Sequence, residues 1–419
     1  MSTTSAPSAL KTHPPTREPV KILLLENIHP SAHQRFQAES FHIETRSGAL
    51  GEEDLVRALE GVHVLGIRSK TRVTARVLES NAASSLLSVG CFCIGTNQVD
   101  LTTANRRGVP VFNAPFSNTR SVAEMIIAEI ICLARQIGDR SREVHAGVWT
   151  KTAVGCHEVR GKTLGVVGYG HIGQQLGVLA EALGLRVLYY DIMAKLPMGN
   201  TRALPTLHAL LEQSDFVSLH VPETAETRNM IGPEQIAAMK KGAYLLNASR
   251  GTVVVIPALA EALRSGHLGG AAVDVYPEEP ETNTNEFRSE LQNLPNVILT
   301  PHVGGSTEEA QEAIGREVSH TLAHFVLTGG TTGAVNFPHL DLPPIRGTHR
   351  VLNVHRNVPG VLRDVNRIVS DLNANIDSQL LSTDANIGYL IMDLEQDVSA
   401  EVSGRIAALK TNIRTRVVY

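Results

Sequence analysis

The sequence predicts an α/β protein with two doubly wound, mostly parallel sheets and a small C-terminal module of a different kind. Three observations lead to this prediction. Short apolar strands alternate with amphipathic helices through most of the chain. A glycine-rich turn opens a second strand–helix series near the middle. A Gly- and Pro-rich stretch at 329–344 reads as a linker, and a βαββαβ pattern typical of a small regulatory module follows it.

The first series begins with an apolar strand at 20–25. Further strands are predicted where short apolar runs recur, and they lie at 63–67, 88–90 and 109–112. Residues 52–59 have helical spacing and would connect the first two strands. Strands that are separated by helices favour a parallel sheet covered on both faces.

The second series opens with a long amphipathic helix at 121–137. Its strands are predicted at 163–167, 186–190, 216–220, 243–247 and 271–275, with a short one at 297–299. A further helix is expected at 307–327. The C-terminal module then shows strands at 350–355, 376–382, 388–394 and 414–419, with helices at 360–372 and 399–409.

Composition and charge exclude several classes of protein. The 419 residues suffice for two or three domains, and 42% hydrophobic with 19% charged residues indicates a globular chain. The net charge of −4 offers no basic excess, so we expect no nucleic-acid partner. Apolar runs fall short of the roughly 20 residues that span a bilayer, and residues 1–19 read as a flexible tail without a signal core. We therefore expect a cytoplasmic protein with no membrane partner.

The four cysteines support the same compartment. Cys91, Cys93, Cys132 and Cys156 show neither a CxxC pair nor metal-finger spacing, so we expect a reducing environment and no metal site. Cys91 and Cys93 are expected to lie buried on one face of a strand.

The glycine-rich turn carries the first functional signal. Gly168, Gly170 and Gly173 form a GxGxxG pattern that ends a strand and opens a helix. The first glycine permits the tight turn, the second lets the backbone approach a pyrophosphate, and the third lets the helix pack on the strand. The helix N-terminus then offers free N–H groups to the anion. A Rossmann-like dinucleotide site is therefore predicted.

An acid at the expected distance strengthens this prediction. Asp191 ends the next strand, 18 residues after Gly173, where a carboxylate binds the ribose hydroxyls. Asp191 would repel a 2′-phosphate, and no arginine follows at 192–195, so NAD is favoured over NADP.

Three later segments carry the residues that oxidation of a 2-hydroxy acid needs. Arg250 can grip a carboxylate in bidentate fashion. His302 has an ordinary pKa suited to removing the hydroxyl proton. Glu279 can orient that imidazole and raise its affinity for a proton, although Glu278 competes for the role. Each of these residues, considered alone, could also be an ordinary surface residue. Their occurrence together, in this order after a nucleotide-binding loop, favours a catalytic role.

These segments resemble the D-isomer-specific 2-hydroxyacid dehydrogenases over about residues 20–330. The resemblance rests on the glycine loop, the Asn-Ala-Ser-Arg-Gly segment at 247–251, Pro-Glu-Glu-Pro at 277–280 and Pro-His-Val-Gly-Gly at 301–305. It implies that Arg250, Glu279 and His302 are the catalytic residues. It also implies that NAD contacts Gly168, Gly170, His171, Ile172, Gly173, Asp191, Ala248, Ser249, Arg250, Asp274, His302, Val303, Gly304 and Gly305.

The resemblance also implies a domain plan. The substrate-binding domain would be discontinuous, at 20–117 and 306–346, with the NAD-binding domain at 118–305 inserted into it. The C-terminal module at 347–419 resembles an ACT domain, which senses small molecules.

The resemblance extends to particular bacterial members of the family, through the segments at 66–71, 89–100 and 113–124. These members oxidise 3-phosphoglycerate to 3-phosphohydroxypyruvate, the first step of serine synthesis. Reduction of 2-oxoglutarate to 2-hydroxyglutarate is implied as a side activity. Arg68, Ser69 and Asn118 are candidates for the substrate phosphate, with Lys151 a weaker one.

Regulation and assembly follow from the same resemblance. His355 and Asn357 can present donors and acceptors to an amino acid, and together with Asn375 of a partner chain they are the implied contacts of L-serine. The alternative is a module that only dimerises. Trp149 would contact a neighbouring subunit or pack in the core, and a homotetramer is implied.

The sequence leaves two other functions open. One is a dehydrogenase for another D-2-hydroxy acid, such as glycerate. The other is an NAD-sensing transcriptional co-regulator on the same fold, which the full Arg-Glu-His set argues against.

Overall fold

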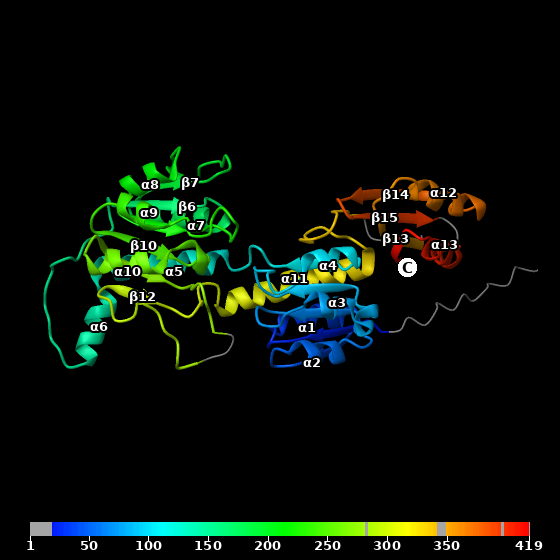
Figure 1. Cartoon of the computed structure of the whole chain (residues 1–419), viewed down its shortest axis with the longest axis horizontal. Helices are drawn as coiled ribbons and strands as arrows, with labels where there is room; N and C mark the ends of the chain where they lie inside the picture. The colour runs from blue at the N-terminus through cyan, green and yellow to red at the C-terminus, as the bar shows by residue number, and fades with distance from the viewer. Residues whose placement is uncertain (1–18, 281–283, 342–348, 395–397, 419) are drawn as a thin grey trace, which may run out of the picture. The chain divides into compact units, whose positions relative to one another are not determined.

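The computed structural model describes residues 19–280, 284–341, 349–394 and 398–418. By its internal contacts the chain divides into two compact units, one of Met1–Ala114 with Gly315–Tyr419 and the other of Pro115–Ile314 (Figure 1). The predicted tail lies outside the described residues except for Pro19. Among the described helices, none is long and apolar enough to cross a membrane.

The first unit contains a five-stranded parallel sheet in the order β2-β1-β3-β4-β5. Its strands are β1 (Lys21–Leu24), β2 (His42–Thr45), β3 (Val64–Ile67), β4 (Ser88–Cys91) and β5 (Val111–Asn113). Its helices are α1 (Ser31–Ala38), α2 (Glu52–Ala58), α3 (Ala75–Glu79) and α4 (Leu101–Arg106). The sequence prediction missed α1 and β2. β2 is an exposed edge strand and α1 has no side-chain cap, so neither shows a strong apolar or capping pattern.

Cys91 and Cys93 do not share one strand face as predicted. Cys91 is buried in β4, whereas Cys93 lies beyond the strand end and is partly exposed. Its thiol donates to the carbonyl oxygen of Gly95 in the following loop.

The second unit is built on a seven-stranded parallel sheet in the order β12-β11-β10-β9-β6-β7-β8. The strands are β6 (Thr163–Val167), β7 (Arg186–Tyr190), β8 (Arg202–Ala203), β9 (Phe216–Leu219), β10 (Ala243–Asn247), β11 (Leu268–Val273) and β12 (Val297–Leu299). The prediction missed β8, which has only two residues, both exposed. The order reverses between β6 and β9, and in a doubly wound sheet the ligand crevice opens at such a switch point.

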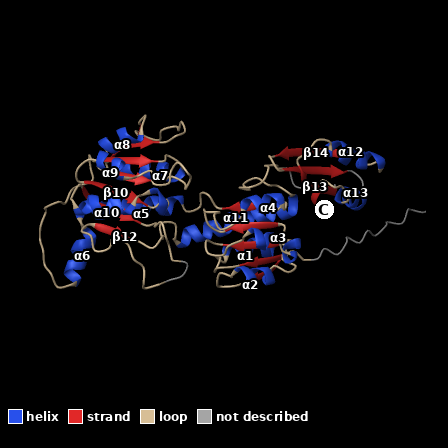
Figure 2. Ribbon diagram, viewed as in Figure 1, coloured by secondary structure: helices blue, strands red, loops and turns tan. Residues whose placement is uncertain are grey.

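Helices cover both faces of this sheet (Figure 2). They are α5 (Thr119–Arg135), α6 (Ile137–His145), α7 (His171–Ala182), α8 (Leu207–Gln213), α9 (Pro233–Ala238) and α10 (Ile256–Arg264). The single helix predicted at 121–137 ends earlier, because Gln136 adopts a left-handed conformation (φ 54°) and separates α5 from α6.

The C-terminal module forms a four-stranded antiparallel sheet in the order β14-β15-β13-β16. Its elements are β13 (His349–Arg356), α12 (Val361–Asp371), β14 (Ile376–Thr383), β15 (Ile387–Leu394), α13 (Ser399–Ala407) and β16 (Asn412–Val418). Val361, Val365 and Ile406 of the two helices join the strands in one apolar cluster. The predicted βαββαβ architecture is confirmed.

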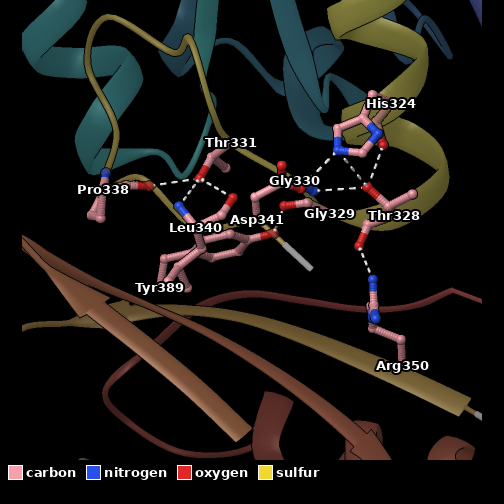
Figure 3. Close-up of polar contacts among 10 residues, drawn as sticks. All are labelled: His324, Thr328, Gly329, Gly330, Thr331, Pro338, Leu340, Asp341, Arg350 and Tyr389. Atoms are coloured by element: carbon pink, nitrogen blue, oxygen red, sulfur yellow. Dashed lines mark hydrogen bonds and ion pairs between the residues drawn. The ribbon is translucent and has the colours of Figure 1, made fainter. Parts of the chain in front are cut away.

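The stretch predicted as a linker is partly packed. α11 (Glu308–Thr328) ends at its start, and Thr331 and Phe337 within it are buried. Figure 3 shows the hydrogen bonds made here: the buried Arg350 donates to the carbonyl oxygen of Thr328 (3.0 Å), and the Tyr389 hydroxyl donates to that of Gly329 (2.6 Å). The C-terminal module is thereby attached to the end of α11.

Candidate active site

The glycine turn after β6 has the geometry of a phosphate-binding loop. A Cβ at Gly168 (φ 89°) would overlap the carbonyl oxygen of His220, which follows the neighbouring strand β9. A Cβ at Gly173 would overlap the carbonyl oxygen of Gly168. At Gly170 the space is open, and α7 begins there without a side-chain cap. The first N–H groups of α7 are thus left for an anion.

Asp191 stands at the end of β7, beside this loop. Its Oδ2 accepts a hydrogen bond from the backbone N–H of Tyr169 (2.8 Å), and its Oδ1 accepts one from Met193 (2.8 Å). Each carboxylate oxygen can accept a further bond. The side chain is therefore held in place while retaining lone pairs for a pair of ribose hydroxyls.

Asp274 organises the loop that carries His302. Its buried carboxylate accepts from the hydroxyl of Thr300 (2.6 Å) and from the backbone N–H groups of Val303 and Gly304 (2.8 Å each). The N–H of His302 donates to the Asp274 carbonyl oxygen (2.8 Å). His302 adopts φ 55°, an uncommon value for a side-chain-bearing residue, and these bonds hold it there.

His302 and Glu279 form a hydrogen-bonded pair. Nδ1 of His302 lies 2.7 Å from Oε2 of Glu279, while Oε1 of Glu279 accepts from the backbone N–H of Tyr276 (3.1 Å). Glu279, rather than Glu278, thus pairs with the histidine. With Nδ1 bonded to the carboxylate, Nε2 is the ring nitrogen left to exchange a proton.

The pair shifts the pKa of both partners. The hydrogen bond to Glu279 raises the pKa of His302 and outweighs burial, which acts the other way. Burial alone would raise the pKa of Glu279, but the bond to His302 and its charge hold it below the ordinary value. The imidazolium form is therefore favoured next to an ionised carboxylate.

Arg250 lies on the loop after β10, which the buried Asn247 holds in shape. Oδ1 of Asn247 accepts from the N–H (3.1 Å) and the hydroxyl (2.8 Å) of Ser249, and its Nδ2 donates to the carbonyl oxygen of Arg250 (3.0 Å). The Arg250 guanidinium is partly exposed and, among the described residues, donates to the Ser249 carbonyl oxygen (2.7 Å). Its other N–H groups can bind a carboxylate. A Cβ at the next residue, Gly251, would overlap the backbone of Tyr276 and Pro277, so the Arg250 loop lies against the segment that leads to Glu279. From there the positive charge of Arg250 acts to lower the pKa of both Glu279 and His302.

The substrate candidates fall in different parts of the chain. Asn118 lies against Gly305, next to the His302 loop, and its Oδ1 is buried without a hydrogen-bond partner among the described residues. Lys151 is exposed on the segment between α6 and β6. Arg68 and Ser69 follow β3 in the other unit, where the carboxylate of Glu26 accepts from backbone N–H groups including that of Arg68 (3.3 Å).

The effector candidates of this chain lie at opposite ends of the C-terminal sheet, because Asn375 precedes the start of β14, which pairs with the end of β15, whereas His355 pairs with Gly388 at the start of β15. His355 is buried at the end of β13, where burial lowers its pKa, and its Nδ1 contacts Oδ1 of Asn353 (2.9 Å). Asn357 is exposed and donates through Nδ2 to the carbonyl oxygen of Asp384 (2.7 Å). Asn375 is exposed just before β14.

Comparisons with known proteins agree with this geometry. Residues 127–304 match the model for the "D-isomer specific 2-hydroxyacid dehydrogenase, NAD binding domain", and residues 352–414 match an "AHAS small subunit-like ACT domain". D-3-phosphoglycerate dehydrogenase of Dictyostelium discoideum is 57% identical over 403 residues, covering 96% of this chain and 98% of that protein. The chain belongs to the D-isomer-specific 2-hydroxyacid dehydrogenases.

Other members of the family are also similar along most of their length. D-3-phosphoglycerate dehydrogenase of Escherichia coli K12 is 50% identical, covering 96% of this chain and 98% of that one. An NAD-complexed family member from Lactobacillus delbrueckii is 27% identical with a TM-score of 0.66, over 76% of this chain and all of that one. D-2-hydroxyisocaproate dehydrogenase is 26% identical with a TM-score of 0.68 over the same shares.

The dehydrogenase uses NAD, and the residues present fit it. The open backbone at Gly170 and the uncapped start of α7 suit a pyrophosphate, and Asp191 suits the ribose hydroxyls. When bound, NAD supplies the acceptor for the hydride. The predictions of the fold, the enzyme class and the cofactor are confirmed; the roles of individual residues stay predictions.

Several residues that hold the site in shape are not predicted by the sequence motifs. Asn247 and Thr300 lie inside or beside the motifs named above, but neither has a chemical role at the reacting atoms, so the motifs alone did not indicate what these two residues do. No motif indicates Glu26, because its carboxylate accepts from Thr71 (2.8 Å), 45 positions away. Asn353, which contacts His355, likewise lies inside an ordinary strand.

Replacing Glu279 with Gln should move the pH dependence of both reaction directions to lower pH. The Glu279 carboxylate raises the pKa of His302, so its loss lowers that pKa. Reduction needs the imidazolium, so its rate falls as the pH rises through the pKa of His302, and in the variant this fall should begin at lower pH than in the wild type. Oxidation needs the neutral imidazole, so in the variant the rate of oxidation should also begin to rise at lower pH. Profiles of kcat/KM against pH measure both; an unmoved profile would contradict the pairing, and Glu278→Gln is the matched control.

Proposed function

We propose that this dehydrogenase oxidises D-3-phosphoglycerate to 3-phosphohydroxypyruvate with NAD, the first step of L-serine synthesis. The observation that carries the proposal is the His302–Glu279 pair beside Arg250, on the loops that follow β11, β12 and β10 of an NAD-binding sheet. Relatives with this substrate in their names are similar over 96% of the chain, which supports the choice of substrate.

Arg250, His302 and Glu279 each have a separate role in the reaction. Arg250 pairs with the substrate carboxylate through parallel N–H groups and so fixes the position of C2. Nε2 of His302 accepts the proton of the C2 hydroxyl, while the hydride leaves C2 for the nicotinamide. Glu279 stabilises the imidazolium that forms, through the 2.7 Å bond to Nδ1. In the reverse direction the same imidazolium returns the proton to the carbonyl oxygen.

The phosphate of the substrate requires further donors. Arg68 and Ser69 supply a guanidinium and a hydroxyl from the loop after β3. The Glu26 carboxylate orders this loop by accepting hydrogen bonds from the loop's backbone N–H groups. Asn118 supplies an amide next to Gly305, and Lys151 an exposed ammonium. A second carboxylate can take the place of the phosphate, and we include reduction of 2-oxoglutarate as a side activity on this ground.

The proposal includes regulation and assembly. L-Serine binds the ACT module at His355 and Asn357, with Asn375 from a second subunit, and inhibits the enzyme.

Trp149 is 84% exposed and Val154 is 81% exposed on the same segment, an apolar surface suited to a further copy in a homotetramer. The free cysteines fit the reducing cytoplasm, where we place the enzyme.

NADH consumption tests the substrate and the regulation together. The purified enzyme should consume NADH with 3-phosphohydroxypyruvate, and kcat/KM with unphosphorylated hydroxypyruvate should be at least about 100-fold lower, because the phosphate contacts are lost. Added L-serine should lower the rate with the phosphorylated substrate. Equal efficiency with both substrates would instead identify an enzyme of glycerate or another D-2-hydroxy acid. NADH binding without turnover would favour an NAD-sensing co-regulator.

A further inference from the structure

The turn between β14 and β15 connects the proposed effector loop to the substrate-binding domain. We propose that Asp384 in this turn is a positioning residue, which transmits effector binding at Asn357 to the sheet of the first unit through Asn105. The inference rests on the proposed regulation by L-serine and adds the path by which that regulation leaves the ACT module.

The effector loop and the turn are bonded to each other on one side. Nδ2 of Asn357 donates to the carbonyl oxygen of Asp384 (2.7 Å), and the backbone N–H of Asn357 donates to that of Asn386 (3.0 Å). Oδ1 of Asp384 accepts from the N–H groups of Asn386 (2.7 Å) and Ile387 (2.8 Å), which fixes the shape of the turn. A displacement of Asn357 is therefore passed to Asp384.

The other oxygen of Asp384 reaches the substrate-binding domain. Oδ2 accepts from Nδ2 of Asn105 in α4 (2.7 Å), and the same Nδ2 also donates to the carbonyl oxygen of Asn336 (2.8 Å). Oδ1 of Asn336 in turn accepts from the N–H of Val111, the first residue of β5 (2.8 Å). β5 runs directly into the segment that carries Asn118, a proposed substrate contact.

This end of the module borders a cleft, whereas other attachments of the module are fixed by arginines, among them Arg414, which donates to the carbonyl oxygens of Ser84 and Leu86, and Arg416, which donates to those of Phe325 and Val326. Residues 336–339 and 382–386 line a cleft of about 550 Å³ beside the Asp384 contact. Oδ1 of Asn105 is buried and has no hydrogen-bond partner among the described residues, so the present arrangement leaves a polar atom unsatisfied. At the start of β13 the buried Arg350 is paired with both oxygens of Asp393 (2.7 and 2.8 Å). Arg350 also donates to the carbonyl oxygen of Thr328, the contact drawn in Figure 3.

The direction of the effect follows from competition at Asn357. An effector that draws the Asn357 amide toward itself loosens its bond to the Asp384 carbonyl oxygen, and the turn then shifts away from Asn105. The Asn105–Asp384 bond thus opposes effector binding, and by linkage the effector opposes the bond. Removing the bond should let L-serine act at lower concentration.

Two substitutions in the full-length enzyme test this. Asp384→Asn keeps Oδ1 for the turn but replaces Oδ2 with an amide nitrogen, which cannot accept from Asn105. Asn105→Ala removes the other partner. Each should lower the L-serine concentration for half inhibition, and the dissociation constant of L-serine, by about fivefold or more. The double variant should show no further change, because both substitutions remove one bond.

Asp377→Asn is the matched control, since Asp377 is an exposed carboxylate on β14 of the same module. It should leave both constants unchanged, and thermal melting verifies that every variant is folded. Wild-type inhibition curves in both test variants, or additive effects in the double variant, would overturn the inference alone. A wild-type enzyme that neither binds L-serine nor is inhibited by it would overturn the regulatory proposal, and this inference with it.

Discussion

Replacing His302 with Ala should lower kcat by about 10²- to 10⁴-fold, the usual contribution of a general acid–base residue. The substitution removes the group that exchanges the substrate proton but leaves the glycine turn and Asp191 untouched. NADH affinity, measured by fluorescence titration, should therefore stay within about twofold of the wild type while turnover of 3-phosphohydroxypyruvate falls.

His208→Ala is the matched control for this substitution. His208 lies exposed on α8 of the same unit and pairs with Glu212 (3.4 Å), so its removal should leave kcat unchanged. Normal turnover in the His302 variant would show that another group moves the proton. A parallel loss of NADH binding would show that the side chain acts mainly in holding the cofactor.

Replacing Arg250 with Ala should lower kcat/KM for 3-phosphohydroxypyruvate by at least about 100-fold. Hydrogen bonds to charged groups contribute about 1.5–3 kcal/mol each, and the guanidinium is expected to make two with the substrate carboxylate. Arg250→Lys keeps the charge without the two parallel N–H groups and should give an intermediate loss. Steady-state kinetics at varied substrate, with NADH saturating, provide the values.

Arg228→Ala controls for the loss of a cation, because Arg228 is exposed and pairs with Glu223 (2.7 Å) in the same unit. It should behave as the wild type. If Arg250→Lys retained full kcat/KM, bidentate binding of the carboxylate would be wrong. If all of the loss in Arg250→Ala were in NADH affinity, Arg250 would bind the cofactor rather than the substrate.

The sequence predicted those parts of the site whose chemistry depends on residue type and order. The glycine turn, Asp191 and His302 each follow a strand, and a parallel sheet brings the carboxyl ends of its strands to one edge. Spacing did not choose between Glu278 and Glu279, because neighbouring carboxylates have the same chemistry. The choice depends on the turn that ties Glu279 to the N–H of Tyr276.

Hydrogen bonds between residues far apart in the sequence could not be predicted, for a physical reason. Glu26 orders the loop of Arg68 by accepting backbone N–H groups, which any sequence offers. Arg350 is 1% exposed in β13, and its partner Asp393 lies 43 positions away. Such pairs are defined by strand register and packing, which residue spacing does not encode.

The stereospecific transfer of hydride from C2 tests the central claim most directly. D-3-phosphoglycerate that carries deuterium at C2 is incubated with NAD and the wild-type enzyme, and the reduced cofactor is analysed by mass spectrometry. The account predicts one deuterium in each reduced cofactor, 3-phosphohydroxypyruvate as the product, and no reaction of the L-enantiomer. Reduced cofactor without deuterium, or equal turnover of both enantiomers, would contradict it.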